Sequence, residues 1–307
     1  MGNCLAIDLK YQVEAYSLLT KFKANNDPIV TGTNKTFAFS KIVLDDIVDQ
    51  LYERLEDPSK INQGGANLCG PAAVIFCWLC KRPDLYVQYV LNVYERGEGR
   101  MGTLFVQPGK DCRNHELNSI RDVDWVALAA LRDSENSRFD FDSEPNYLGA
   151  ITMPDDVEKW FENIGFNVLE SRTVAMCSEG YETLRKAALY YKEGCCVCLL
   201  VNATKIFGGP WWDLNLTANH WIVMTSEPKI NGVSVLSIPS ENGLLDKPID
   251  FEVYTWGVRK YLQKWRNIVL EDFLDGFYGI IAAKYDENSA FARKLSLLSE
   301  FGKNLSY

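Results

Sequence analysis

Helical hydrophobic patterns dominate the first part of the chain. Apolar residues recur at helical spacing over 43–55, and an almost unbroken apolar segment follows Pro71. Proline at a first helical position, and glycine or proline after the last one, indicate where such segments begin and end. These patterns predict helices over 11–21, 43–55, 70–81, 84–96, 123–132, 154–164 and 183–191.

The pattern changes after residue 194. The sequence CCVCLLV at 195–201 is a short continuous apolar run, typical of a strand buried on both faces. Further strands are predicted over 220–225, 233–238, 249–256 and 277–283. The turn-rich link EPKING predicts that 220–225 and 233–238 pair as a hairpin. Helices followed by an antiparallel sheet indicate the α+β class.

Composition narrows the classes of partner. The 307 residues are 47% hydrophobic and 24% charged, which is ordinary for a globular protein. The net charge is -9 and no Lys/Arg block is present, so we do not expect the protein to bind nucleic acid. No apolar run approaches the length of a membrane span, and the first residues lack the pattern of a secretory signal peptide.

Cysteine usage favours a reducing compartment. The chain has nine cysteines, an odd number, and they cluster as CxxC and CCxC rather than as a disulfide framework. Cys77 and Cys80 lie within an apolar helix, and no second CxxC follows at zinc spacing, so core packing is expected. We therefore expect neither a metal nor a cofactor.

One group of residues combines several parts of a catalytic site. Cys69 lies at the start of the predicted buried helix, Gln63 precedes it by six residues, and His220 begins a predicted strand. A helix N-terminus and an imidazole both favour the thiolate and lower the pKa of a cysteine. Imidazole also serves as acid and base, and a glutamine amide can donate to the oxyanion of a tetrahedral intermediate.

The sequences QGGANLCGPAA at 63–73 and NHWIVMT at 219–225 resemble the papain-like cysteine-hydrolase superfamily. The resemblance implies Cys69 as nucleophile, His220 as base and Gln63 as oxyanion donor. It also implies a papain-like α+β fold, with an N-terminal appendage at 1–40 and the papain-like domain at 41–307. The helical half would span about 41–190 and the sheet half about 191–290.

A longer resemblance suggests a biological setting. The sequences at 124–136, 150–166 and 219–224, with YTWG at 254–257, are similar to poorly characterised bacterial effectors of the type VI secretion machinery. This implies a toxin made in the bacterial cytoplasm without a signal peptide and exported into a target cell. A cognate immunity protein or a secretion chaperone would then be a partner.

The third member of the catalytic group is open. If the predicted hairpin turns near 229–230, the residue opposite His220 falls near 239, in a window that includes Ser240, Glu241 and Asn242. We favour Glu241, whose carboxylate would orient the imidazole. Alternatively, YTWG resembles the papain-type NSWG, and Tyr254 then occupies the position of the asparagine.

Two further features bear on ligands. Trp211 and Trp212 follow Gly-Gly-Pro shortly before His220 and would either line a substrate cleft or fill the space under a loop. The N-terminal MGNC offers Gly2 for myristoylation and Cys4 for palmitoylation, although residue 6 is not Ser or Thr. Membrane contact is expected only if a host cell acylates these residues.

Together these features predict a cysteine-dependent amide hydrolase, a peptidase or glutamine deamidase, acting on a protein. A papain-like binding module with a degraded triad is one alternative. A peptidoglycan amide hydrolase is another, disfavoured because acidic proteins are poorly matched to the anionic cell wall.

Overall fold

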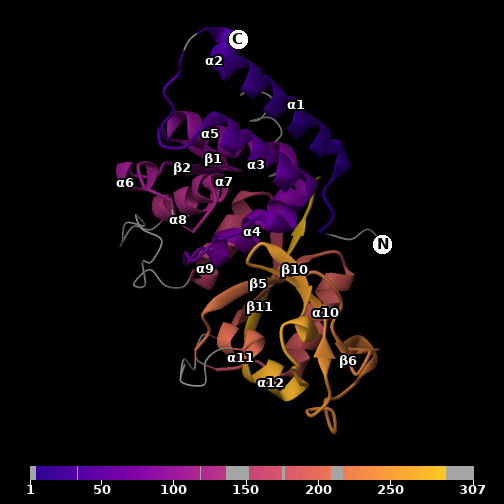
Figure 1. Ribbon diagram of the computed structural model, residues 1–307. Coiled ribbons are helices and arrows are strands. Elements are labelled where there is room, and N and C mark those ends of the chain that lie inside the picture. Colours follow the sequence, from indigo (N-terminus) through magenta and orange to yellow (C-terminus); the bar gives the residue numbers. More distant parts are fainter. Residues whose placement is uncertain are drawn as a thin grey trace.

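The computed structural model describes residues 5–32, 34–117, 119–135, 152–174, 177–208 and 217–287. The α+β class is confirmed: helices gather in the upper part of Figure 1, and the largest sheet lies below them. The upper helices are α1 (Leu9–Asn26), α2 (Pro28–Thr31), α3 (Leu44–Glu56), α4 (Cys69–Lys81), α5 (Pro83–Arg96), α6 (Lys110–Arg113), α7 (Asp122–Asp124), α8 (Ala130–Glu135) and α9 (Pro154–Asn163). Below them lie α10 (Tyr181–Lys192), α11 (Ala203–Phe207) and α12 (Leu270–Asp275).

Within the described residues, six strands form the main sheet in the order β10-β9-β5-β4-β11-β3, and all neighbouring pairs are antiparallel. Smaller sheets pair β1 with β2 and join β7, β6 and β8. The strands are β1 (Gly99–Met101), β2 (Leu104–Val106), β3 (Phe166–Thr173), β4 (Cys196–Val201), β5 (His220–Met224), β6 (Lys229–Ile230), β7 (Val233–Ser234), β8 (Ile249–Asp250), β9 (Glu252–Thr255), β10 (Val258–Tyr261) and β11 (Phe277–Tyr285).

Helix α4 lies between the helical layer and the sheet (Figure 1). Every residue from its first to its twelfth position is buried, as the unbroken apolar sequence requires. On the sheet side, the ring of Phe76 stacks on Tyr254 of β9 with 3.9 Å between centroids. On the other side, Trp78 packs against Tyr89 of α5. The helix that begins with Cys69 is therefore held from both sides.

The sheet separates two hydrophobic cores. Side chains of a strand alternate between its faces, and in β4 Cys196 and Cys198 join the core around α4. Val197 and Leu199 face the opposite core, which includes residues of α10 and α12. The continuous apolar run at 195–201 thus forms a strand covered on both faces, as predicted.

The predicted strand at 233–238 is wrong. Only Val233–Ser234 is a strand, and a short 3-10 turn follows it. This segment does not pair with β5, because β4 and β9 occupy the two edges of β5. The hydroxyl of Tyr181 instead donates to the carbonyls of Val235 and Ile238, 3.2 and 3.1 Å away, and holds the segment against α10.

Two segments belong to other parts of the fold than the sequence led us to expect. The region expected to be an appendage includes α1, whose Ala15 and Leu19 are buried in the main core against the helical layer. The expected helical half includes β3, which forms one edge of the main sheet beside β11. Among the described residues, no helix is long and apolar enough to cross a membrane.

Candidate active site

Cys69 is the first residue of α4 and is only 4% exposed. Three backbone N–H groups, those of Trp221, Gly70 and Cys69 itself, lie near its sulfur. Burial nevertheless raises the pKa of the thiol, although these donors and the charge of Arg132 act to lower it. The lowered pKa expected from the helix N-terminus is therefore wrong here, because desolvation outweighs the donors. The resting residue is a protonated thiol.

The position after Cys69 accepts no side chain. A Cβ on Gly70 would lie 2.4 Å from the Cβ of Thr152, which no real contact permits. The carbonyl of Thr152 in turn accepts a hydrogen bond of 2.9 Å from the indole Nε1 of Trp221. The segment before α9 and the beginning of β5 are thus packed directly against the start of α4, with Cys69 between them.

His220 begins β5 and is buried, with 4% of its surface exposed. Its Nε2 lies 2.6 Å from Oγ1 of Thr255 on the neighbouring strand β9. The imidazole stacks on the indole of Trp256 at 4.4 Å between centroids, and Phe207 of α11 meets it edge-on. Burial lowers the pKa of His220 to about 3, so the imidazole is neutral near neutral pH.

A tight turn between β9 and β10 presents Trp256 to the imidazole. Thr255 pairs with Val258, which leaves Trp256 and Gly257 as the two turn residues. Both have left-handed backbone conformations, with φ of 46° and 77°, as a type I′ hairpin requires. Such a conformation is costly for tryptophan, so tertiary contacts must hold the ring in place over His220.

Gln63 lies in the loop before α4 and is 8% exposed. Its Nε2 donates a hydrogen bond of 2.8 Å to the carbonyl of Ala66, and the N–H of Ala66 returns a bond of 3.1 Å to the Gln63 carbonyl. The amide is therefore held in a defined turn. Among the described residues, no hydrogen bond joins the Cys69 sulfur to the amide of Gln63 or to the imidazole of His220.

The residue that hydrogen-bonds to the imidazole is Thr255, which was not among the predicted third members. Glu241 lies in a turn where its carbonyl accepts the N–H of Leu244, and its charge acts on Tyr181 of α10 rather than on His220. The hairpin on which Glu241 was chosen does not exist, since β5 pairs with β9. The resemblance of YTWG to NSWG indicated the strand that lies beside β5, in which Thr255 follows Tyr254.

The other predicted third members also lie apart from the imidazole. Ser240 and Asn242 share the exposed turn with Glu241, where Ser240 Oγ accepts the N–H of Asn242 at 3.3 Å. Tyr254 donates its hydroxyl hydrogen to the carbonyl of Ile61 at 2.7 Å. Its ring belongs to the α4 side of the sheet.

A buried positive charge lies near Cys69. Arg132 of α8 is 7% exposed and lies 3.6 Å from the carboxylate of Asp156 on α9. Its charge acts on the Cys69 thiol in the direction that favours the thiolate. In the sequence Arg132 is only the last residue of the predicted helix over 123–132, because its approach to Cys69 depends on tertiary packing.

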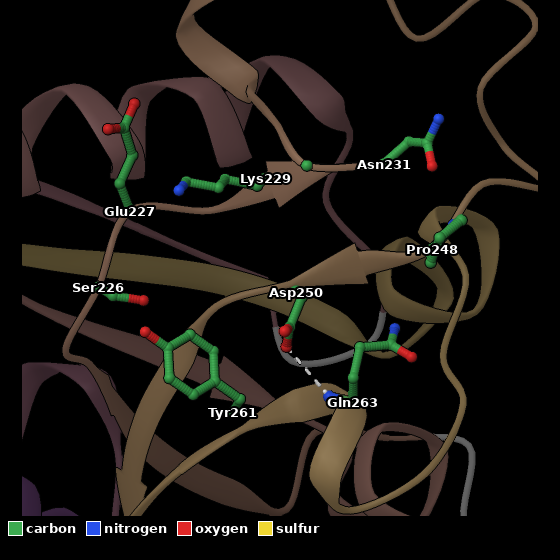
Figure 2. A pocket seen from close by; sticks show the side chains of 9 residues that line it. Ser226, Glu227, Lys229, Asn231, Pro248, Asp250, Tyr261 and Gln263 are labelled. Atoms are coloured by element: carbon green, nitrogen blue, oxygen red, sulfur yellow. Dashed lines mark hydrogen bonds between the residues drawn. The ribbon is translucent and has the colours of Figure 1, made fainter.

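Some predicted ligand-binding residues lie outside the described part of the chain. These are Trp211 and Trp212, and likewise Gly2 and Cys4. A pocket of about 560 Å³ lies between β6, β8 and β10 (Figure 2). Its lining includes Glu227, Lys229, Asp250 and Tyr261, and none of the candidate active-site residues.

Comparison with known proteins assigns no relative. No protein-family model, no curated protein and no solved structure matches the chain. The function is therefore inferred from the geometry around Cys69 and His220.

Proposed function

We propose that the protein is a cysteine-dependent amide hydrolase with Cys69 as nucleophile and His220 as base. The observation that supports it best is the position of the Trp221 N–H, which lies close enough to the Cys69 sulfur to lower the pKa of the thiol. Trp221 directly follows His220 in β5, so the strand that begins with His220 approaches Cys69, although 150 residues separate the two residues in sequence.

The proton moves within this pair. We assign Nε2–H of His220 as the donor to Oγ1 of Thr255, which leaves the lone pair of Nδ1 to accept the thiol proton. The Cys69 sulfur then bonds to the amide carbon, and the C–N bond breaks as the imidazolium returns the proton to the leaving amine. Water hydrolyses the thioester, which releases the acid and restores the thiol. Because the thiolate and imidazolium form together, each stabilises the other in the buried site.

Negative charge that develops during the reaction has donors nearby. The backbone N–H groups of Cys69 and Gly70 at the start of α4 lie near the sulfur. We assign the amide of Gln63 as a further donor to the oxyanion, as the resemblance implies. Preorganised donors of this kind each contribute about 10²–10³ to the rate in hydrolases.

The proposed substrate is an amide of a protein, cleaved by peptidase or deamidase chemistry. The acidic chain, with a net charge of -9, suits a protein target better than the anionic cell wall. A role as an exported bacterial effector is part of the same proposal and rests on the sequence resemblance alone.

Acylation by p-nitrophenyl acetate tests the proposal. Cys177 is exposed and serves as a free-thiol reference within the same chain. We expect Cys69 to acylate faster than Cys177 and to release one nitrophenolate per chain in the initial burst. Replacing His220 by Gln should slow acylation of Cys69 by about 100-fold and leave Cys177 unchanged. If Cys69 reacts no faster than Cys177, or if H220Q reacts like the wild type, the protein is a non-enzymatic scaffold.

A further inference from the structure

The loop that contains Gln63 is fastened to the β9–β10 hairpin. The hydroxyl of Tyr254 donates to the carbonyl of Ile61 at 2.7 Å, two residues before Gln63. Gly257, in the turn of the hairpin, packs directly on Asn62, since a Cβ there would lie 2.8 Å from the Asn62 Nδ2. The hairpin thus contacts the loop at two positions.

The same hairpin fixes the imidazole. Thr255 bonds to Nε2 of His220, and Trp256 stacks on its ring. Neighbouring side chains of a strand point to opposite faces of the sheet. Tyr254 accordingly reaches the loop and α4, and Thr255 reaches His220. One short element therefore contacts both groups that must be aligned with Cys69.

A buried ion pair holds the loop from the helical side. Arg54 of α3 and Asp124 are each 1% exposed in their side chains and lie 2.7 Å apart. The same carboxylate accepts a hydrogen bond of 3.1 Å from the backbone N–H of Asn62. A buried ion pair seldom increases stability over an apolar pair. Here it also satisfies a backbone N–H of the loop, so the two residues directly before Gln63 are both anchored.

We propose that Tyr254 is a positioning residue that aligns the oxyanion-donor loop with His220 and Cys69. The inference rests on the proposed function. Tyr254 contacts neither substrate nor the reacting atoms. Its hydroxyl fixes the carbonyl of Ile61, and through it the turn from which Gln63 projects. Misplacing a catalytic group by about 1 Å can cost up to about 100-fold in rate, so one lost hydrogen bond has a measurable effect.

Two small probes separate alignment from general reactivity. Acylation by p-nitrophenyl acetate passes through an oxyanion and needs the donors of the loop. Alkylation by iodoacetamide displaces iodide at a saturated carbon and forms no oxyanion, so it reports only the access and nucleophilicity of Cys69. A variant that disturbs the loop should therefore affect the first reaction and not the second.

Tyr94 provides a matched control for Tyr254. It is also buried, its ring stacks on Phe37 at 4.6 Å, and its hydroxyl donates to a backbone carbonyl, that of Ile42, at 3.0 Å. Y94F thus removes the same kind of bond from the same kind of environment in α5. Both tyrosine-to-phenylalanine variants should lower the unfolding midpoint by similar amounts.

The expected result is specific to Y254F. Its acylation of Cys69 by p-nitrophenyl acetate should fall roughly 10-fold or more, with alkylation by iodoacetamide unchanged, and Y94F should match the wild type in both. In the double variant with Q63A, Y254F should add no further loss, because the two residues act through one group.

Other outcomes identify what fails. If Q63A slows acylation but Y254F does not, Tyr254 has no positioning role. If Y94F and Y254F slow acylation equally, the effect is one of general stability, and the inference is overturned as well. If wild-type Cys69 acylates no faster than Cys177, the proposed function fails, and the role of Tyr254 fails with it.

Discussion

Burial of His220 predicts a measurable loss of stability in mild acid. The imidazole has an ordinary pKa of 6.5, and burial in the folded protein lowers this pKa to about 3. The unfolded chain therefore binds a proton below pH 6.5 that the folded protein excludes. The contribution of this group is complete above pH 6.5 and is lost progressively as the pH falls from 6.5 towards 3.

The magnitude follows from the interval between the two pKa values. Each pH unit within it is equivalent to about 1.4 kcal/mol, so at pH 5 the contribution of His220 has fallen by about 2 kcal/mol relative to pH 7.5. Carboxylates also titrate in acid, so the wild type must be compared with a variant that lacks only the imidazole. H220Q removes the titration and keeps a side chain able to bond to Thr255.

Urea unfolding at pH 7.5 and pH 5 measures the difference through tryptophan fluorescence. The free energy of unfolding should fall by about 2 kcal/mol more in the wild type than in H220Q. The chain has only one other histidine, His115, which the wild type and H220Q share. Equal falls in the wild type and H220Q would refute the argument, because the imidazole would then be hydrated in the folded protein.

Two further variants test the anchors of the Gln63 loop. R54M leaves the carboxylate of Asp124 buried without its cation and should reduce the free energy of unfolding in urea by about 3–5 kcal/mol; a loss below about 1 kcal/mol would be that of an exposed pair. G257A places a Cβ 2.8 Å from the Asn62 amide at a left-handed position, and its loss should exceed about 1 kcal/mol. G243A has a similar φ of 73° but open space around it, so an equal loss in both would exclude a role for the contact with Asn62.

Local patterns were sufficient for most individual elements. The apolar run after Pro71 predicts α4 because a helix of this composition is stable only when buried on all sides. The run at 195–201 predicts β4 for the same reason. β3 was missed because its polar, largely exposed sequence at the edge of the sheet has no strong hydrophobic signal.

Local sequence patterns did not indicate which strands pair with each other. The link after β5 was expected to return as a hairpin, but it forms a separate small sheet, and β9 occupies the edge of β5 instead. This choice decides the neighbour of His220, and it replaces Glu241 with Thr255. Pairing depends on which distant segments cover the two faces of a strand, a property that no window of sequence contains.

The sequence by itself determined the candidate chemistry: which cysteine begins a buried helix, which of two histidines begins a buried strand, and which glutamine precedes the cysteine. Only the tertiary structure decided the protonation states and the alignment. Burial, which depends on the whole surrounding structure, raises the pKa of Cys69 and lowers that of His220. Alignment depends on Tyr254 and Thr255, whose partners lie 193 and 35 residues away along the chain and meet them only when the sheet packs on α4.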